Sequence, residues 1–63
     1  MTGVAERAYR RAASLAPGDP EALLELGRFL FQYGRSEEGR ALLERVASAP
    51  SPFAHAARRL LDP

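Results

Sequence analysis

Cysteine is absent from the 63 residues of the sequence, and histidine occurs once, as His55. Disulfide bridges are therefore excluded, and a structural zinc site is not expected, because such a site needs about four nitrogen or sulfur ligands. A chain of this length buries only roughly 60% of the surface that its unfolded form exposes, so one core gives it marginal stability. We therefore expect its stability to depend on close local packing or on packing against another chain.

Lysine, isoleucine, asparagine and tryptophan are also absent, and all nine basic residues are arginine. We interpret this as the bacterial-like composition of a GC-rich genome. The eight acidic residues leave a formal net charge of +1, so a general electrostatic attraction to nucleic acid is not expected. The β-branched residues are only Thr2, Val4 and Val46, which argues against any strand.

Signals for membranes and for catalysis are missing as well. No apolar run approaches the ~20 residues needed to span a bilayer, and the N-terminal residues lack the basic and then apolar layout of a signal peptide. The sequence has no cysteine nucleophile, no glycine-rich phosphate loop after a strand and no pair of histidines at metal spacing. We therefore expect a cytoplasmic protein that is not an enzyme and that binds no cofactor, metal or membrane.

A first helix is predicted over residues 3–16. Thr2 is its candidate N-cap, and Pro17 disfavours the helical conformation of the residue before it. Gly18 is expected to close the helix in the left-handed conformation. The apolar positions of this helix recur at three- and four-residue steps, and they are Ala5, Tyr9, Ala12, Ala13 and Ala16.

A second helix is predicted over residues 20–33. Asp19 is a good N-cap acceptor, and Pro20 suits the first helical position because its missing N–H would be unpaired there anyway. Gly34 is expected to end this helix. The link that follows is so short that the second and third helices should form an antiparallel hairpin.

The third and fourth helices are predicted over residues 37–48 and 52–61. Ser36 is the candidate cap of the third, and Ser51 with Pro52 repeats the pattern of a cap followed by proline. Their apolar positions are Gly39, Leu42, Leu43, Val46, Ala47, Phe53, Ala56, Ala57 and Leu60. The predicted fold class is all-α, with four short antiparallel helices in one domain, residues 1–63.

The layout repeats when the sequence is shifted by thirty-four residues. Caps, small residues and large residues then coincide. Thr2 falls on Ser36, Ala5 on Gly39, Tyr9 on Leu43, Ala12 on Val46, Ala13 on Ala47, Ala22 on Ala56, Leu23 on Ala57, and Leu26 on Leu60. The first and third helices are therefore one kind of element, and the second and fourth another.

This period and pattern resemble the tetratricopeptide repeat. The first-helix motif of that family is matched by Leu23, Leu26, Gly27, Leu30 and the turn residue Gly34. The second-helix motif is matched by Ala5, Tyr9, Ala12 and Pro17, and more loosely by Gly39, Leu43 and Val46. The resemblance implies helical hairpins of an α–α superhelix, out of phase: a second helix, one complete repeat over residues 20–51, and a first helix.

Two glycines inside predicted helices need a packing reason, because glycine costs about 1 kcal/mol relative to alanine in a helix interior. These are Gly27 and Gly39. We expect two helix backbones to approach each other closely at these positions.

In the family that the sequence resembles, the first helix of each repeat lines a concave groove that holds an extended peptide or a partner helix. The resemblance thus implies a partner-binding groove on the second and fourth helices. Its expected residues are Glu21, Leu24, Arg28, Phe31, Gln32, His55, Arg58 and Arg59, with Asp62 at the edge. Leu24 and Phe31 beside the arginines of this set predict a protein or peptide partner that is apolar and carries acidic groups.

Specificity of the co-chaperone type is not supported, because that carboxylate clamp needs lysine and asparagine where Leu24, Glu25 and Arg28 stand. Three alternatives stay open. Leu24 and Phe31 are core residues in one, and in another they pack against a neighbouring repeat or a second copy in a homo-oligomer. In the third, the second and third helices form a helix-turn-helix that binds DNA, although the acidic residues of the third helix oppose this.

Overall fold

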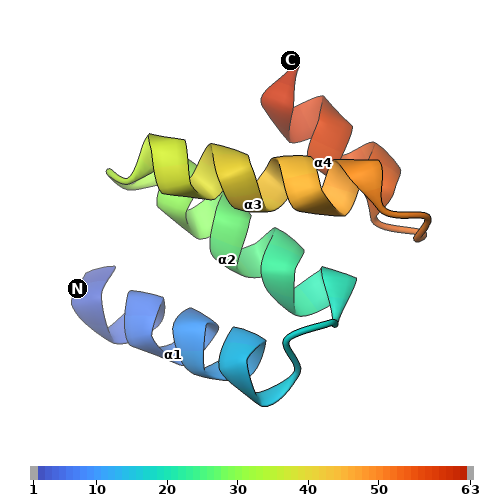
Figure 1. Ribbon diagram of the computed structural model, residues 1–63. Helices are drawn as coiled ribbons and strands as arrows, with labels where there is room; N and C mark the ends of the chain where they lie inside the picture. Colours follow the sequence, from blue (N-terminus) through green and yellow to red (C-terminus); the bar gives the residue numbers. More distant parts are fainter. Residues whose placement is uncertain (1, 63) are drawn as a thin grey trace.

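The computed structural model describes residues 2–62, without the side chain of Thr2, and it is all-α as predicted (Figure 1). Its helices are α1 (Thr2–Leu15), α2 (Pro20–Gln32), α3 (Ser36–Ser48) and α4 (Ala54–Leu61). Residues 2–62 contain no strand. The expected cap at Thr2 lies outside the described side chains.

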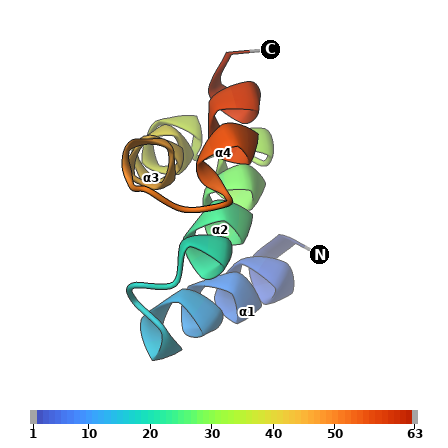
Figure 2. The same ribbon diagram turned by 90° about the vertical axis from the view of Figure 1, so that its right-hand side faces the viewer.

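The helices pack in chain order. α2 lies between α1 and α3, and α4 packs against α3. Two views at right angles show that α1 and α4 lie at opposite ends of the array (Figures 1 and 2). Within residues 2–62, α3 is therefore packed between two helices, whereas α1 packs mainly against one, α2.

The start of α2 is capped as the sequence predicts. Asp19 has an extended backbone, and its Oδ1 accepts a hydrogen bond of 3.0 Å from the backbone N–H of Glu21. Pro20 occupies the first helical position. Ser51 makes the matching bond before α4, since its Oγ accepts from the N–H of Phe53 at 3.2 Å. α4 itself begins only at Ala54, two residues later than expected, because Pro52 and Phe53 form a turn.

Two expected helix ends are wrong in detail. Ser36 is not a cap: the carbonyl of Arg35 accepts the N–H of Gly39, which makes Ser36 the first helical residue, and no side chain caps α3. Gly18 does not have a positive φ. The N–H of Asp19 instead bonds the carbonyl of Ala16 at 2.9 Å, so the chain turns tightly with proline in the second position of the turn.

Gly34, in contrast, does close α2 in the left-handed region, with a φ of 125°. The next N–H, from Arg35, bonds back to the carbonyl of Leu30 at 3.0 Å. This six-residue closure is a Schellman motif, which satisfies a carbonyl that the helix leaves free. It fixes the short reversal between α2 and α3.

The core lies between α2, α3 and α4. Its buried hydrophobic residues are Leu26, Leu30, Leu43, Val46, Ala47 and Ala57. Of the remaining motif residues, Gly27 and Gly39 are buried, Leu23, Ala5 and Tyr9 are half-buried, and Ala12, Pro17 and Gly34 are exposed. None of residues 3–15 of α1 is fully buried, so α1 contributes to the fold without entering this core.

Gly27 and Gly39 lie where the backbones of α2 and α3 come closest. A Cβ atom on Gly39 would lie 2.7 Å from the carbonyl oxygen of Gly27 and 2.9 Å from Cα of Phe31. A Cβ atom on Gly27 would lie 3.1 Å from the side chain of Leu43. Glycine at position 39 therefore sets the spacing of the hairpin, since the backbone atoms that it faces cannot move aside, whereas Gly27 faces mainly the flexible side chain of Leu43.

Candidate functional site

A groove of about 430 Å³ lies between α2 and α4, and we call it the α2–α4 groove. Its lining residues are Leu24, Glu25 and Arg28 from α2, and Ala56, Arg59 and Leu60 from α4. The two helices place them on facing sides because α4 packs on α3 beside α2. The groove thus follows the two helices that are equivalent in the internal repeat.

The floor of this groove is apolar and anchored. Leu24 and Leu60 are half-buried and pack against the buried cluster around Leu43. Their accessible sides can take an apolar side chain without any change in the core. A ligand that covers them would remove apolar surface from water, which is favourable by about 25 cal/mol per Å² before the costs of association.

The charged residues that line the groove are two arginines and one glutamate, Arg28, Arg59 and Glu25. Arg28 donates a hydrogen bond of 2.6 Å to Glu25, and its side chain is still 48% exposed. Because a guanidinium has five N–H donors, that bond leaves others free for a carboxylate. Arg59 is exposed, and it makes no ion pair within residues 2–62. The rim can therefore bind an acidic group on either side of the apolar floor.

Of the eight residues predicted for a groove, the structure brings Leu24, Arg28 and Arg59 together. Phe31 packs against the core cluster instead, with the guanidinium carbon of Arg40 5.7 Å from its ring centre. Arg58 donates a hydrogen bond of 3.1 Å to the carbonyl of Ala47. Its guanidinium is therefore directed toward α3.

The other three predicted residues, Glu21, Gln32 and His55, are exposed and do not line the α2–α4 groove. The groove is also lined by Glu25, Ala56 and Leu60, which the sequence pattern did not predict. Glu25 could have been found by its position three residues before Arg28, which favours a pair on one helix face. A role in binding stays a prediction for all of these residues.

A second hollow, of about 380 Å³, lies between α1 and α2, and we call it the α1–α2 hollow. It shares Glu25 and Arg28 with the groove, and its other lining residues are Ala5, Tyr9, Phe29, Gln32 and Tyr33. Three aromatic rings form its wall: the ring centre of Phe29 lies 5.3 Å from that of Tyr9 and 5.0 Å from that of Tyr33. The contact between Tyr9 and Phe29 attaches α1 to α2.

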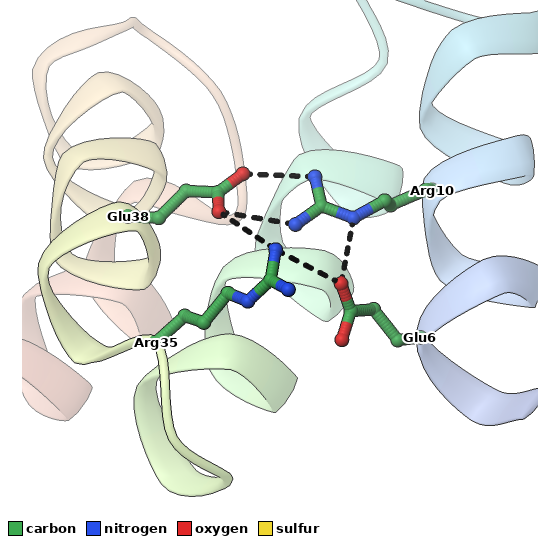
Figure 3. Close-up of polar contacts among 4 residues, drawn as sticks. All are labelled: Glu6, Arg10, Arg35 and Glu38. Carbon is green, nitrogen blue, oxygen red and sulfur yellow. Dashed lines mark hydrogen bonds and ion pairs between the residues drawn. The ribbon is translucent and has the colours of Figure 1, made fainter. Parts of the chain in front are cut away.

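Four charged side chains join α1 to the start of α3 (Figure 3). Arg10 donates two hydrogen bonds to Glu38, of 2.8 and 3.0 Å, and one of 2.9 Å to Glu6. Arg35 lies 3.4 Å from Glu6 and 4.0 Å from Glu38, so opposite charges alternate around the cluster. The hydrogen bonds from Arg10 lower the pKa of the Glu38 carboxyl, and the bonds to Glu38 and Glu6 raise the pKa of the Arg10 guanidinium.

Among the described residues, no three acidic, histidine or cysteine side chains gather as metal ligands would. None of the four described helices is long and apolar enough to cross a membrane.

Comparison with known proteins supports the repeat. A family model described as tetratricopeptide repeat matches residues 2–61. No curated protein and no solved structure gives a significant match. Repeats of this family generally mediate protein–protein interactions and are typically not enzymes. Because the match covers nearly all of the chain, the chain belongs to the tetratricopeptide repeat family.

Proposed function

We propose that this chain is a protein–protein interaction module whose α2–α4 groove binds an apolar segment of a partner that carries acidic side chains. The observation that supports this most is the pairing of an apolar floor, Leu24 and Leu60, with two arginines on the rim. The apolar contacts supply affinity. Arg28 and Arg59 supply preference, because charge-assisted bonds to carboxylates are stronger than bonds between neutral groups.

The groove favours a short segment as its ligand. Six residues line it and its volume is about 430 Å³, which suits a few side chains of a peptide or one face of a helix. Interfaces of this size lie at the weak, transient end of protein–protein association. We therefore expect micromolar rather than nanomolar binding for a single groove.

Selection from a random 16-residue peptide library displayed on phage tests the proposal. Enriched clones are synthesised with a fluorescent label, and their affinity is measured by fluorescence polarisation. We expect enriched clones to combine leucine or phenylalanine with aspartate or glutamate. Arg59→Glu should weaken their binding about tenfold or more, since it places a negative charge on the rim of the groove.

Arg45→Glu is the matched control, because Arg45 is an exposed arginine of α3 outside the groove. It should leave the affinity within about twofold. An equal loss of peptide affinity in the two variants, or enrichment of basic peptides, would contradict the proposed role of the groove. Circular dichroism of both variants checks that neither change unfolds the chain.

A further inference from the structure

The two arginines that line the α2–α4 groove differ in what they already bind. Arg28 is paired with Glu25, and its Nη2 lies 2.6 Å from Oε1 of that carboxylate. Arg59 makes no ion pair within residues 2–62, and α4 contains no acidic residue. The groove therefore offers one free guanidinium from α4, and one from α2 that is bound to a carboxylate of the chain itself.

Glu25 and Arg28 form the part of α2 that separates the groove from the α1–α2 hollow. Both residues line the two cavities, whereas Leu24 lines only the groove and Phe29 lines only the hollow. At 3.6 residues per turn, Arg28 lies about 40° around the helix from Leu24, and Glu25 lies about 100° from it in the same direction. The ion pair therefore draws the guanidinium of Arg28 toward the hollow and away from the apolar floor of the groove.

Glu25 also places a negative charge on the lining of the groove. Its side chain is 40% exposed, so a ligand in the groove can approach it. A ligand carboxylate that binds Arg28 must displace Glu25 or share the guanidinium with it, and two like charges then lie side by side. Such a juxtaposition disfavours association, and more strongly as the ligand excludes water from the groove. A carboxylate that binds Arg59 displaces no other carboxylate.

We propose that Glu25 is a specificity-determining residue of the α2–α4 groove. It holds Arg28 and so restricts the groove to apolar segments with a single acidic side chain, which binds Arg59. This inference rests on the proposed function and refines it, because it assigns different roles to the two arginines. The partner is then a segment in which one aspartate or glutamate accompanies apolar residues, and a segment with a second acidic group is rejected.

Glu25→Gln is the variant that tests this role. Glutamine has nearly the size and the helix propensity of glutamate, and an exposed pair at this spacing contributes little to stability, so the chain should stay folded. Glu44→Gln is the matched control. It makes the same change of charge at an exposed glutamate of α3 that lies outside the groove and makes no ion pair within residues 2–62.

The random 16-residue phage library is selected in parallel on the original chain, Glu25→Gln and Glu44→Gln. We expect the consensus motif of the enriched clones to contain one acidic residue for the original chain and for Glu44→Gln. For Glu25→Gln it should contain a second one, because Arg28 is then free to bind it. The same acidic content in all three sets of clones would overturn the proposal.

Fluorescence polarisation then compares two peptides that differ by one glutamate-to-glutamine change, a double-acid peptide from the Glu25→Gln clones and its single-acid counterpart. The double-acid peptide should bind Glu25→Gln about fivefold more tightly than it binds the original chain. The single-acid peptide should bind both within about twofold. An equal gain for the two peptides would mean a general effect of charge and would overturn the proposal, since a specificity-determining residue must change the ratio of the two affinities.

Two further variants locate the effect. Arg28→Gln added to Glu25→Gln should remove the gain of the double-acid peptide, and a gain that survives would overturn the role of Arg28. Arg59→Glu should weaken the single-acid peptide about tenfold in the original chain. No weakening there would contradict the groove itself and this inference with it. Weakening by Arg59→Glu together with an unchanged preference in Glu25→Gln would contradict the role of Glu25 alone.

Discussion

α1 and α3 are equivalent helices of successive repeats, yet they are held in the protein by different forces. α3 lies between two helices and contributes Leu43 and Val46, which are 0% and 1% exposed. α1 has no fully buried residue in its described part and is attached by the ring contact of Tyr9 and by the ion pairs of Arg10. The two helices share the sequence pattern of the repeat, but α3 buries its large apolar residues because it has a packed helix on each side.

The difference has a consequence for local stability. Burial of large apolar side chains stabilises a helix by several kcal/mol, whereas exposed ion pairs contribute at most about 1 kcal/mol each. α1 should therefore open more readily than α3, and its opening should leave the α2–α3–α4 core intact. The following substitutions test this difference, beginning with the largest expected effect.

Gly39→Ala should cause the largest loss of stability, because residue 39 lies against the backbone of α2. The added methyl group would lie 2.7 Å from the carbonyl oxygen of Gly27 and against backbone atoms of Phe31. The helices must separate, and we expect a loss of about 3 kcal/mol, enough to unfold much of a domain of this size. Urea denaturation followed by circular dichroism measures it.

The equivalent position of α1 already carries alanine, as Ala5. Gly3→Ala is the matched control, since nothing lies within 4 Å of a Cβ atom there. It should stabilise α1 by up to about 1 kcal/mol through helix propensity. Similar effects of the two glycine substitutions would show that close approach is not the reason for glycine at position 39.

Leu43→Ala and Tyr9→Ala compare equivalent residues of the two helices directly. Leu43 is completely buried, and its truncation should cost about 3 kcal/mol and lower the stability of the whole domain. Tyr9 is half-buried, and its loss removes one ring contact with Phe29, at a cost of about 1 to 2 kcal/mol.

Hydrogen exchange distinguishes the two variants. Tyr9→Ala should accelerate exchange in α1 only, and Leu43→Ala should accelerate it throughout α2, α3 and α4. Uniform acceleration by Tyr9→Ala would show that α1 unfolds together with the core and is not a separate unit.

Disruption of the ion-pair cluster should lower the stability by a smaller amount, which depends on pH and salt. Arg10→Met removes the bonds between α1 and Glu38, and we expect a loss of at most about 1 kcal/mol because the side chains are partly exposed. The pKa of Glu38 is lowered in the folded state. The stabilisation is therefore fully present above the unfolded pKa, about 4.3 for glutamate, and is lost as the pH falls through the lower folded value.

Thermal unfolding between neutral pH and about pH 2 measures this pH-dependent stabilisation in Arg10→Met and in a second variant, Glu38→Gln. Both variants should lose less stability on acidification than the original chain does, and both should respond less to added salt. If their acid and salt profiles match that of the original chain, the cluster does not hold α1 in place.

The same contrast explains how far the sequence predicts the structure. Features set by neighbours along the chain were predictable: the cap at Asp19 and the turn at Gly34 follow from local backbone chemistry. The glycines between α2 and α3 were predictable as well, because a glycine inside a helix needs a packing reason. The prediction of Ser36 as a cap was wrong because α3 begins one residue earlier than expected, directly after the Schellman closure at Gly34. The prediction of a left-handed conformation at Gly18 was wrong because Pro17 already makes a tight turn without a positive φ.

Features set by contacts between distant residues were not predictable. Arg10 and Glu38 are twenty-eight residues apart, and no spacing rule joins them. Phe31 satisfies the periodicity of a groove residue, but the crossing of α2 over α3 directs it to the core cluster, under Arg40. Sequence periodicity defines the faces of a helix, and only packing decides which neighbour each face meets.

Ala12→Val should have the smallest effect and gives the sharpest contrast with α3. It places in α1 the residue that α3 has at the equivalent position, Val46. Ala12 is exposed, so valine gains no burial and loses helix propensity, and we expect a loss of only about 0.5 kcal/mol. Val46→Ala should cost more than twice as much, because Val46 is 1% exposed. Urea denaturation of both variants measures the difference, and a stabilising Ala12→Val would mean that residue 12 of α1 is covered in solution.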